Sequence, residues 1–484
     1  MVIFLDMVGD LFHVGHLNHL NEAKKYGDIL VVSVTSDAYV NKGPGRPFFN
    51  ISQRLQILSS IDVIDFLIIS DSPNSVLNIN KVKPNIYFKG PDYKNLSQDF
   101  TGFINKEIKE IKKNKGKIVF GSGETFSSSV ILNKISNFTD DQKKIISYVK
   151  NKYKFEEIFS KIQKVSNNLK ILVVGEMIID KFIFCTALGK SGKEAILNLE
   201  KKKDIDFIGG SGAICNNLID FTKKTELLSF LGSDDNKLKF IKQNLSKKIK
   251  TNFFYKKNSK TIIKTKFIDN STNNKLMGLY DFDDKRLIPS EEKVFIKKIK
   301  KSVKRNNFII VSDYGHGLIS TKVASMISKM KNVIINTQLN SANIGYHTIS
   351  KYKNVNWAII NEVELRHEMR NRYEDIKKLM SLLSKRLNIQ NLIVTAGNKG
   401  SYYLNQRTKN FSHCPAFAIN IVDKIGSGDS FMAIFSIMNN AFPKDPKISL
   451  FLSSLATTQV LEGFGNQKSI KLVNLLKGMK YILK

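Results

Sequence analysis

The fold of the first part of the chain is indicated by residues 2–35, which read VIFLDMVGDLFHVGHLNHLNEAKKYGDILVVSVT. An apolar, β-branched run at residues 2–5 comes before a glycine turn, a helical stretch near residues 17–26 and a second apolar run at residues 29–34. A third apolar run stands at residues 66–69. Strands that alternate with helices in this way predict βαβ units, and therefore a parallel sheet in a Rossmann-like domain.

The same alternation begins again in the second part of the chain. Short apolar runs that predict buried strands, each followed by a helix, stand at residues 170–175, 309–313, 333–336, 358–361 and 392–395. They predict a second parallel sheet with helices on both faces, an α/β/α domain. Residues 261–279 look like strands without helices, and we interpret them as a small β-lid.

The two patterns are separated by residues 138–168, which are polar, lysine-rich and helical in period. We therefore predict an α/β protein of two parallel-sheet domains, at residues 1–137 and 169–484, joined by a helical connector at residues 138–168.

Composition narrows the class of protein. Hydrophobic residues make up 42% of the 484 residues, which excludes a wholly disordered chain. Lysine and arginine number 76 against 43 acidic residues, giving a formal charge of +33 that invites a nucleic-acid interpretation. The lysines are spread from Lys24 to Lys484 and no single arm holds the excess. We therefore expect no nucleic-acid partner; a nucleic-acid-binding protein would instead show steep salt dependence on arbitrary duplex.

Cysteines and the N-terminus indicate the compartment. Cys185, Cys215 and Cys414 lie far apart, so no disulfide framework or zinc site is indicated, which fits a reducing environment. Asp6 interrupts the apolar run at the N-terminus, and no stretch approaches the roughly 18 apolar residues that span a bilayer. We expect a cytoplasmic protein with no membrane partner.

The first chemical motif lies between the first strand and the first helix. Asp10-Leu-Phe-His13-Val-Gly15-His16 places two histidines and a glycine at a helix N-terminus. Free backbone N–H groups and the helix dipole favour phosphate there, and histidines add donors for a transferring phosphoryl group. The motif predicts a phosphate site.

This region resembles the nucleotidyltransferase superfamily with the signature H-x-G-H, and in detail the adenylyltransferase domain of bifunctional heptose-phosphate enzymes, over residues 3–136. Further matching segments are Val34-Thr-Ser-Asp37, Lys42…Gly45-Arg46-Pro47, Gln53-Arg54, Lys89-Gly-Pro-Asp-Tyr93 and Thr125-Phe-Ser127-Ser128-Ser129. The resemblance implies that the nucleotide and its phosphates are bound by Asp10, His13, Gly15, His16, Lys42, Arg46, Lys89, Ser127, Ser128 and Ser129. One departure is Gly9, where the family usually has Phe.

The chemistry implied for this domain is an in-line displacement at the α-phosphorus with pyrophosphate as the leaving group. Such a reaction depends on positioning and charge neutralisation, with no covalent protein nucleophile. Histidines, lysines, helix N-termini and Mg²⁺ suit it. The sequence leaves the choice between ATP and CTP open.

The second chemical motif is Asp423-Lys-Ile-Gly426-Ser427-Gly428-Asp429-Ser430, directly before an apolar helix. Gly-x-Gly at this position lets backbone N–H groups close around an anion. Asp429 follows where a carboxylate can accept a proton from an attacking sugar hydroxyl.

The order of further motifs resembles the ribokinase-like sugar kinases over residues 169–475. These motifs are Gly209-Gly210-Ser-Gly212, Asn361-Glu-Val-Glu364 and Thr395-Ala-Gly397. The likeness is greatest to the heptose-phosphate kinase domain, through Val174-Gly-Glu-Met-Ile-Ile-Asp180 and Ser312-Asp313-Tyr-Gly-His-Gly317.

The resemblance implies that Asp429 is the general base and that the amides of Gly426, Ser427 and Gly428 form the anion hole. The sugar would be bound by Asp180, Gly209, Gly210 and Asp313. The nucleotide and its phosphates would be bound by Asn361, Glu364, Thr395 and Gly397. Asn361 and Glu364 would also organise Mg²⁺, which would be held through the phosphates, with Glu364 as a candidate protein ligand.

Four departures concern the sugar site. Ala213 replaces Asn, Lys424-Ile425 replaces smaller residues, Asn336-Thr-Gln338 replaces Asp-Pro-Lys, and Gly278-Leu-Tyr-Asp281 lacks an arginine. They leave open that the second domain is a catalytically silent sugar-binding or regulatory module.

For the whole chain we predict a bifunctional enzyme of nucleotide-sugar biosynthesis, feeding lipopolysaccharide or another surface polysaccharide. It would phosphorylate a heptose-phosphate-like sugar with MgATP, and transfer a nucleotidyl group, adenylyl by preference, to a sugar 1-phosphate. The family usually carries the kinase first, so the domain order here is reversed. We expect sugar phosphates and nucleotides as ligands, and a homodimer. The alternative is a cytidylyltransferase for an alcohol or sugar phosphate, fused to a divergent kinase module.

Overall fold

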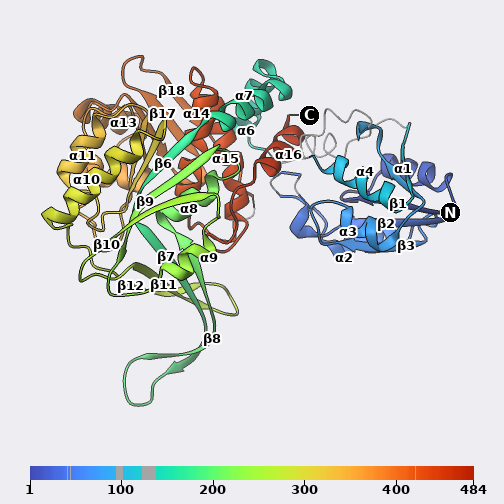
Figure 1. Cartoon of the computed structure of the whole chain (residues 1–484), viewed down its shortest axis with the longest axis horizontal. Coiled ribbons are helices and arrows are strands. Elements are labelled where there is room, and N and C mark those ends of the chain that lie inside the picture. Colours follow the sequence, from blue (N-terminus) through green and yellow to red (C-terminus); the bar gives the residue numbers. More distant parts are fainter. Residues whose placement is uncertain (41, 44, 94–101, 123–137, 420, 484) are drawn as a thin grey trace. The chain divides into compact units, whose positions relative to one another are not determined.

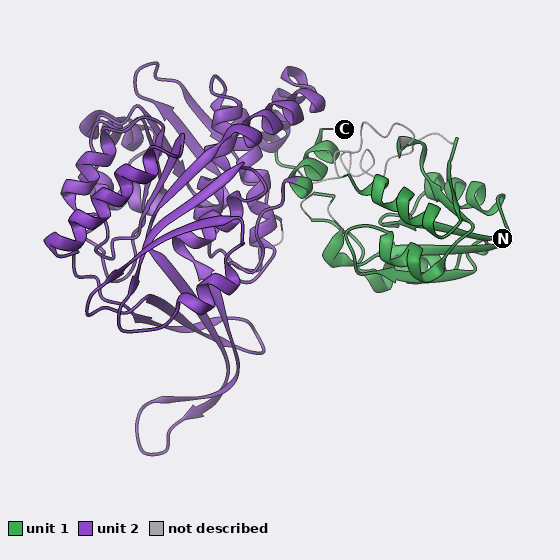
Figure 2. Ribbon diagram, viewed as in Figure 1, with its two compact units in different colours: residues 1–139, 473–484 green, residues 140–472 purple. Residues whose placement is uncertain are grey.

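The computed structural model describes residues 1–40, 42–43, 45–93, 102–122, 138–419 and 421–483. The chain forms two compact units, one of residues 1–139 with 473–484 and one of residues 140–472 (Figure 2). The predicted boundaries differ from these in two ways. The connector belongs to the second unit, and the last helix groups with the first unit even though it follows the second in the sequence.

The first unit is built on a five-stranded sheet in the order β3-β2-β1-β4-β5, and every neighbouring pair is parallel. The strands are β1 (Val2–Met7), β2 (Ile29–Thr35), β3 (Phe66–Ser70), β4 (Ile86–Lys89) and β5 (Lys117–Phe120). The helices are α1 (Val14–Lys24), α2 (Ile51–Ser59), α3 (Val76–Val82), α4 (Phe103–Lys113) and α16 (Leu472–Ile482), with short 3-10 turns η1 (Asp37–Tyr39) and η2 (Pro91–Tyr93). This confirms the predicted parallel α/β class.

Alternation along each central strand gives the first unit two cores. Leu5 and its neighbours pack with Leu20 of α1 and Leu58 of α2, whereas Phe4 on the other face packs with Ile79 of α3 and Ile111 of α4. Helices therefore cover both faces of the sheet (Figure 1). The carboxyl ends of the strands are left to carry functional groups.

The second unit is built on a nine-stranded sheet in the order β10-β9-β6-β13-β14-β15-β16-β17-β18. The strands are β6 (Lys170–Gly175), β9 (Lys224–Gly232), β10 (Ile249–Lys256), β13 (Phe308–Asp313), β14 (Val333–Thr337), β15 (Trp357–Asn361), β16 (Asn391–Thr395), β17 (Ser401–Asn405) and β18 (Phe411–Cys414). All neighbouring pairs from β10 to β16 are parallel, and β17 and β18 add an antiparallel edge.

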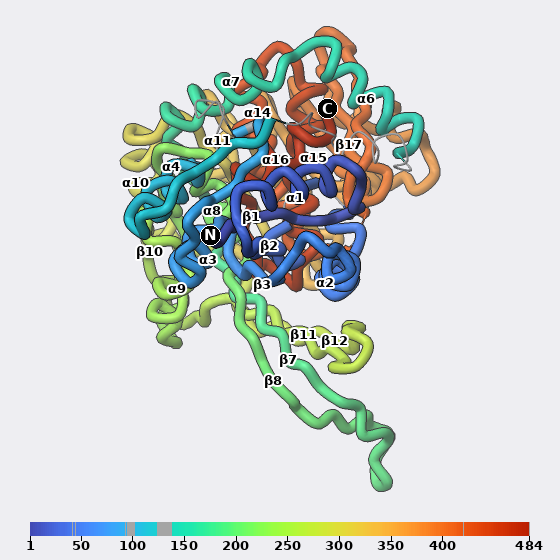
Figure 3. Tube along the Cα trace, turned by 90° about the vertical axis from the view of Figure 1, so that its right-hand side faces the viewer, coloured from blue at the N-terminus to red at the C-terminus, as the bar shows by residue number. Residues whose placement is uncertain are grey.

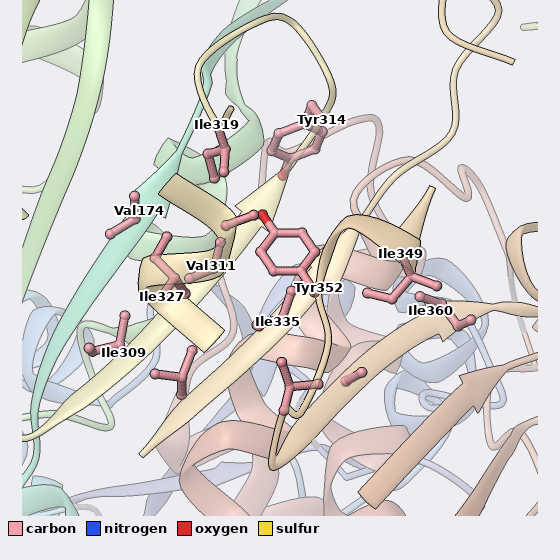
Figure 4. Close-up of a cluster of buried hydrophobic side chains, with 14 of the residues drawn as sticks. Val174, Ile309, Val311, Tyr314, Ile319, Ile327, Ile335, Ile349, Tyr352 and Ile360 are labelled. Carbon is pink, nitrogen blue, oxygen red and sulfur yellow. The ribbon is translucent and has the colours of Figure 1, made fainter. Parts of the chain in front are cut away.

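Helices flank this sheet on both faces. They are α6 (Asp140–Lys152), α7 (Phe155–Asn168), α8 (Gly210–Leu218), α9 (Leu238–Asn244), α10 (Pro289–Val303), α11 (Thr321–Ser328), α12 (Glu362–Met369), α13 (Ile376–Leu387), α14 (Ser427–Ala441) and α15 (Pro446–Leu461), with 3-10 turns η4 (Ile349–Lys351) and η5 (Gly397–Lys399). Figure 4 shows one core, in which Val174, Val311, Ile335 and Ile360 of four strands gather with Tyr352. The continuous burial of these strands explains why the sequence revealed them.

A four-stranded sheet in the order β12-β11-β7-β8 forms the lid. It contains β7 (Met177–Lys190), β8 (Leu197–Gly209), β11 (Ile262–Asp269) and β12 (Lys275–Asp281). Only β11 and β12 were predicted. The outer parts of β7 and β8 project as a hairpin (Figures 1 and 3), and their side chains are mostly exposed, so they lack the apolar alternation that marks a strand.

The predicted connector forms the two helices α6 and α7. Besides its buried apolar residues and a hydrogen bond from Gln142 to the Ala416 carbonyl at 2.6 Å, α6 is held at its end by one carboxylate. Asp445 accepts hydrogen bonds from the hydroxyls of Tyr148 at 2.8 Å and Tyr153 at 2.9 Å, and from Lys152 Nζ at 2.8 Å. In the described part of the chain, no helix combines the length and apolar character needed to cross a membrane.

Candidate active sites

The two histidines of the first motif form the N-terminal cap of α1. His13 is the N-cap: its Nδ1 accepts from the backbone N–H of Gly15 at 3.1 Å, and its own backbone N–H donates to His16 Nδ1 at 3.3 Å. The rings stack with centroids 3.9 Å apart. Because both Nδ1 atoms accept, the neutral rings carry their proton on Nε2. His13 Nε2 is buried and has no hydrogen-bond partner among the described residues.

Both imidazoles are held neutral. Burial lowers the pKa of His16 to about 3, with further contributions from His13 and the ammonium of Lys42. Burial and then Lys42 also lower the pKa of His13. Each ring can therefore donate one hydrogen bond from Nε2, and the Lys42 charge adds an attraction for anions.

The loop after β2 is tied to the same place by Asp10. This carboxylate accepts from Arg46 Nε at 2.6 Å and from the backbone N–H groups of Phe48 and Phe49 at 3.0 Å. Burial alone would raise the pKa of Asp10, but these donors outweigh it and lower the pKa. Arg46 Nη2 is buried without a partner among the described residues, so the guanidinium keeps donor capacity for a ligand.

Two other residues of the first motif region have packing roles. Gly9 has φ +66°, and a Cβ there would lie 3.0 Å from Leu58 Cδ1, so the backbone and the space both favour glycine. Arg54 is fully buried and donates to the carbonyls of Val8 at 2.6 Å and Thr35 at 2.7 Å, which joins the carboxyl ends of β1 and β2.

Lys89 lies in a buried polar cluster below the sheet edge. Its Nζ is 3.2 Å from Glu107 Oε2 and lies over the rings of Tyr87 and Tyr93 at 4.9 and 4.7 Å. Burial acts to lower the pKa of Lys89, but Tyr87 and Glu107 raise it well above its usual value. The ammonium is therefore charged and already paired. The predicted residues Ser127, Ser128 and Ser129 lie outside the described residues.

The second motif opens helix α14. Gly426 is its N-cap with φ +77°, and a Cβ there would lie 2.1 Å from Asn466 Oδ1. Ser427 and Gly428 follow in the first turn, and a Cβ at Gly428 would meet no atom within 4 Å. The space beside Gly428 is therefore open. The Ser427 N–H lies 3.4 Å from the Lys424 carbonyl oxygen, a weak bond, so this helix N-terminus keeps donor capacity for an anion.

Asp429 stands in the same turn. Its Oδ1 accepts from the hydroxyl of Tyr314 at 2.8 Å. Burial, with a smaller effect of Asp180, raises the pKa of Asp429 to about 7 against the opposing effects of Tyr314 and Lys264. A carboxylate with this pKa is a competent base near neutral pH.

The sugar-site residues Asp180, Gly209 and Gly210 come together around the start of the lid. Asp180 Oδ2 accepts from Asn466 Nδ2 at 3.3 Å, and Lys266 Nζ lies 3.7 Å from Oδ1. A Cβ at Gly209 would lie 2.2 Å from Asp180 Oδ2, so the glycine makes room for the carboxylate. Asn466 thus links the surroundings of Asp180 to those of Gly426.

The sequence analysis missed two lysines of this site. In the parallel pairing of β11 with β7, Lys264 lies opposite Asp180 and Lys266 opposite Phe182, so both lysines share the face of Asp180. Lys264 Nζ is 5.9 Å from the ring centroid of Tyr314. Burial lowers the pKa of both lysines and Asp180 opposes that effect. The alternation Lys264-Thr-Lys266 in a predicted strand was the available signal.

The nucleotide-side residues lie at the ends of parallel strands. Asn361 ends β15 and pairs in register with Thr395, the end of β16, and Gly397 follows with φ +56°. Asn361 and Glu364 form a capping box on α12, with N···O distances of 2.8 and 2.7 Å. Burial, with a smaller effect of Asp429, raises the pKa of Glu364 to about 7.

A direct Mg²⁺ bond to Glu364 fits this geometry poorly. Oε2 accepts from the backbone N–H of Asn361 and Oε1 from that of Leu339 at 3.1 Å, so both oxygens are already engaged. Among the described residues, no group of three or more His, Cys, Asp or Glu side chains could hold a metal ion. This arrangement suits a cation that is held mainly by the nucleotide phosphates.

Asp313, predicted to bind the sugar, lies in a dense polar network at the end of β13. Its carboxylate is fully buried and engaged by Lys351 Nζ at 2.5 Å, the hydroxyl of Tyr352 at 2.7 Å and the backbone N–H of Gly315 at 3.2 Å. This network fixes the turn after β13. The neighbouring Tyr314, which the sequence analysis passed over, is the residue that contacts Asp429.

Comparison with known proteins finds two family matches, each over a separate part of the chain. Residues 10–139 match the family described as cytidylyltransferase-like, and residues 168–462 match the pfkB family of carbohydrate kinases. The order of the two matches is the predicted one.

Curated relatives carry the name bifunctional protein HldE. The protein of Helicobacter pylori (strain G27) is 33% identical over 144 residues, which is 29% of this chain and 28% of that protein. The protein of Geobacter metallireducens is 40% identical over 94 residues, 19% of either chain. Each match thus spans less than a third of the relative's length.

Solved structures show the fold of the larger part. Ribokinase from Thermotoga maritima matches 64% of this chain and 99% of its own at 17% identity, with a TM-score of 0.51. Phosphofructokinase-2 from Escherichia coli matches 65% of this chain and 100% of its own at 12% identity, with a TM-score of 0.52. These likenesses confirm a ribokinase-like α/β fold.

Proposed function

Because the chain belongs to the pfkB family of carbohydrate kinases over residues 168–462 and carries a cytidylyltransferase-like domain before it, we propose a bifunctional enzyme of nucleotide-sugar biosynthesis. The second unit phosphorylates a heptose-phosphate-like sugar with MgATP. The first unit transfers an adenylyl group to a sugar 1-phosphate and releases pyrophosphate. The observation that carries the proposal is Asp429, a carboxylate of pKa about 7 at the open N-terminus of α14.

In the kinase reaction Asp429 acts as the general base. Tyr314 occupies Oδ1, which leaves Oδ2 to accept the proton of the attacking sugar hydroxyl. The hydroxyl oxygen bonds to the γ-phosphorus as the bond to the ADP oxygen breaks. The backbone N–H groups of Ser427 and Gly428 stabilise the charge on the transferring group, and Asp180 orients the sugar. Mg²⁺ on the nucleotide phosphates supplies charge neutralisation.

Lys264 and Lys266 favour an acceptor that is itself anionic. Both stand on the face of the lid that carries Asp180, and Lys264 forms no ion pair among the described residues. A neutral sugar would leave this ammonium with only the partial compensation that Asp180 and other nearby carboxylates provide, whereas a phosphate substituent would pair with it directly.

In the nucleotidyl transfer the protein supplies hydrogen-bond donors and positive charge to the phosphates. The Nε2–H group of His13 has no partner among the described residues and can donate to a phosphate oxygen, as the neutral ring of His16 can from its own Nε2. Lys42 and Arg46 add positive charge. The sugar phosphate oxygen attacks the α-phosphorus in line, and pyrophosphate leaves with its charge compensated by these groups. No protein nucleophile is needed.

A second candidate is cytidylyl transfer in place of adenylyl transfer. It is favoured by the description of the family that residues 10–139 match. Incubation of the full chain with ATP or CTP and a sugar 1-phosphate, followed by pyrophosphate assay, separates the two. Release with CTP alone would reject the adenylyl assignment, and release with neither would reject nucleotidyl transfer. A parallel ADP assay with heptose phosphates and free heptose tests the kinase.

A further inference from the structure

The last helix, α16, is part of the first unit although it follows the whole kinase domain in the sequence. Residues 473–484 group with residues 1–139, and the chain between them forms the second unit. Leu475, Leu476, Gly478 and Met479 of α16 are buried. The helix is therefore packed along its length.

One face of α16 meets the segment that carries Lys42. A Cβ at Gly478 would lie 3.5 Å from Gly43 Cα, and Lys42 Nζ lies 5.5 Å from the ring centroid of Tyr481. Gly478 and Tyr481 are three residues apart, so they stand on the same side of the helix. A glycine weakens a helix interior, but here it lets the two backbones approach closely.

The segment that α16 contacts is the one that faces the paired histidines. The charge of Lys42 acts on both His13 and His16, and Arg46 on the same segment is bonded to Asp10 at 2.6 Å, beside the N-terminus of α1. Asp10 therefore holds this segment at Arg46, and α16 contacts the same segment at Lys42 and Gly43.

We propose that α16 is a positioning element of the nucleotidyl-transfer site, and that Gly478 and Tyr481 hold Lys42 and Gly43 in the place where Lys42 meets the nucleotide phosphates. The proposal rests on the function proposed above for the first unit. It means that nucleotidyl transfer depends on residues at the other end of the chain, whereas phosphorylation by the second unit does not.

Two matched pairs of variants in the full chain test this proposal. Gly478→Leu places a branched side chain against Gly43, whereas Gly478→Ala adds only an atom at ordinary contact distance. Tyr481→Leu removes the ring below Lys42, and Tyr481→Phe keeps it. We expect Gly478→Leu and Tyr481→Leu to raise the KM for nucleotide in pyrophosphate release by about tenfold or more. Both should also speed amide hydrogen exchange around Lys42, with ADP formation unchanged.

The control variants Gly478→Ala and Tyr481→Phe should remain close to the parent protein. Parental KM and exchange in Gly478→Leu would overturn the proposal. If Gly478→Leu loses ADP formation as well, the substitution has damaged the whole chain, and the two Tyr481 variants then provide the test. Equal KM for nucleotide and equal hydrogen exchange in Tyr481→Leu and Tyr481→Phe would also overturn the proposal. Absence of pyrophosphate release from the parent would instead reject the proposed function, and hydrogen exchange would still report on the packing.

Discussion

Among single residues, Asp429 gives the clearest prediction, because its pKa should set the pH dependence of sugar phosphorylation. With a pKa of about 7, its carboxyl is about half ionised at neutral pH, and only the ionised form accepts a proton. We expect kcat/KM for sugar phosphorylation to rise with pH through about 7 and then to level off. Asp429→Asn should lower ADP formation by about 10²–10⁴-fold and leave pyrophosphate release unchanged. A flat pH profile in the parent would contradict this role.

Tyr314 is expected to determine the pH at which kcat/KM for sugar phosphorylation rises. Its hydroxyl donates to Asp429 and lowers the pKa of the carboxyl. Tyr314→Phe removes the bond, so the rise in kcat/KM should move to higher pH. Tyr403→Phe is a matched control, because that buried hydroxyl donates to Asn391 at 2.9 Å. An unshifted profile in Tyr314→Phe would show that the hydrogen bond does not act in catalysis.

The neutral histidines of the first unit predict that nucleotidyl transfer depends on pH differently from sugar phosphorylation. Since burial lowers the pKa of His16 to about 3, its ring stays neutral throughout the working range. Pyrophosphate release should therefore be nearly constant where phosphorylation falls off in acid. His16→Ala should lower pyrophosphate release and spare ADP formation, with His19→Ala as the control. A titration near the ordinary histidine pKa that disappears in His16→Ala would refute the neutral-ring interpretation.

Lys264 is the residue that should distinguish anionic from neutral acceptors. Lys264→Gln removes a charge-assisted contact of about 1.5–3 kcal/mol, which corresponds to about a tenfold to hundredfold higher KM for a phosphorylated sugar. The KM for ATP should not change. Lys260→Gln is the control, because that lysine is exposed and pairs only loosely with Asp281 at 3.4 Å. Equal effects of Lys264→Gln on both substrates would contradict the assignment.

At the scale of elements, the attachment of α6 depends on Asp445. Its three donors outweigh burial and lower the pKa of the carboxyl below its ordinary value of 3.8. A lowered folded-state pKa means that the stabilisation is complete at neutral pH and is lost only as pH falls below about 4. Asp445→Asn should cost about 1–3 kcal/mol of unfolding free energy at pH 7, measured by denaturant titration.

Asp141→Asn is the matched control for Asp445→Asn. It removes an exposed ion pair with Lys144 on the same helix, worth about 0–1 kcal/mol. If the two variants lose equal stability at pH 7, the Asp445 cluster does not hold the connector.

Elements that are buried on both faces could be predicted from the sequence, and elements that depend on distant partners could not. The apolar runs of β1, β2, β6 and β13 were visible because central parallel strands are apolar throughout. The hairpin of β7 and β8 was missed because its exposed part lacks apolar alternation, and β8 carries charged residues at consecutive positions 200–204. The histidine cap and the start of α14 were found because local spacing determines them.

The parts of the sites that were missed come from register and long-range contact. Lys264 lies beside Asp180, 84 residues earlier in the chain, only because β11 pairs with β7 in this register. The contacts of Asp313 with Lys351 and Tyr352 could not be predicted either, because these partners come from residues 38 and 39 positions further along the chain. No local pattern reports such partners.

At the scale of the whole molecule, two units with separate chemical roles share one chain. Asp429 and Asp180 belong to the second unit, and His13, His16 and Lys42 belong to the first. Of the formal charge of +33, the proposed sites use only a few residues, such as Lys42, Arg46 and Lys264. A basic surface also attracts the anionic substrates that both proposed reactions use.

The return of the chain to its first unit has a consequence for biosynthesis. Residues 140–472, that is 472 − 139 = 333 residues, must be translated before α16 exists. At about 5–20 residues per second, residues 1–139 wait roughly 17–67 seconds on the ribosome, once they are complete, for this helical partner. A nascent first unit can build its sheet early, but it acquires this final contact only after the kinase domain has emerged.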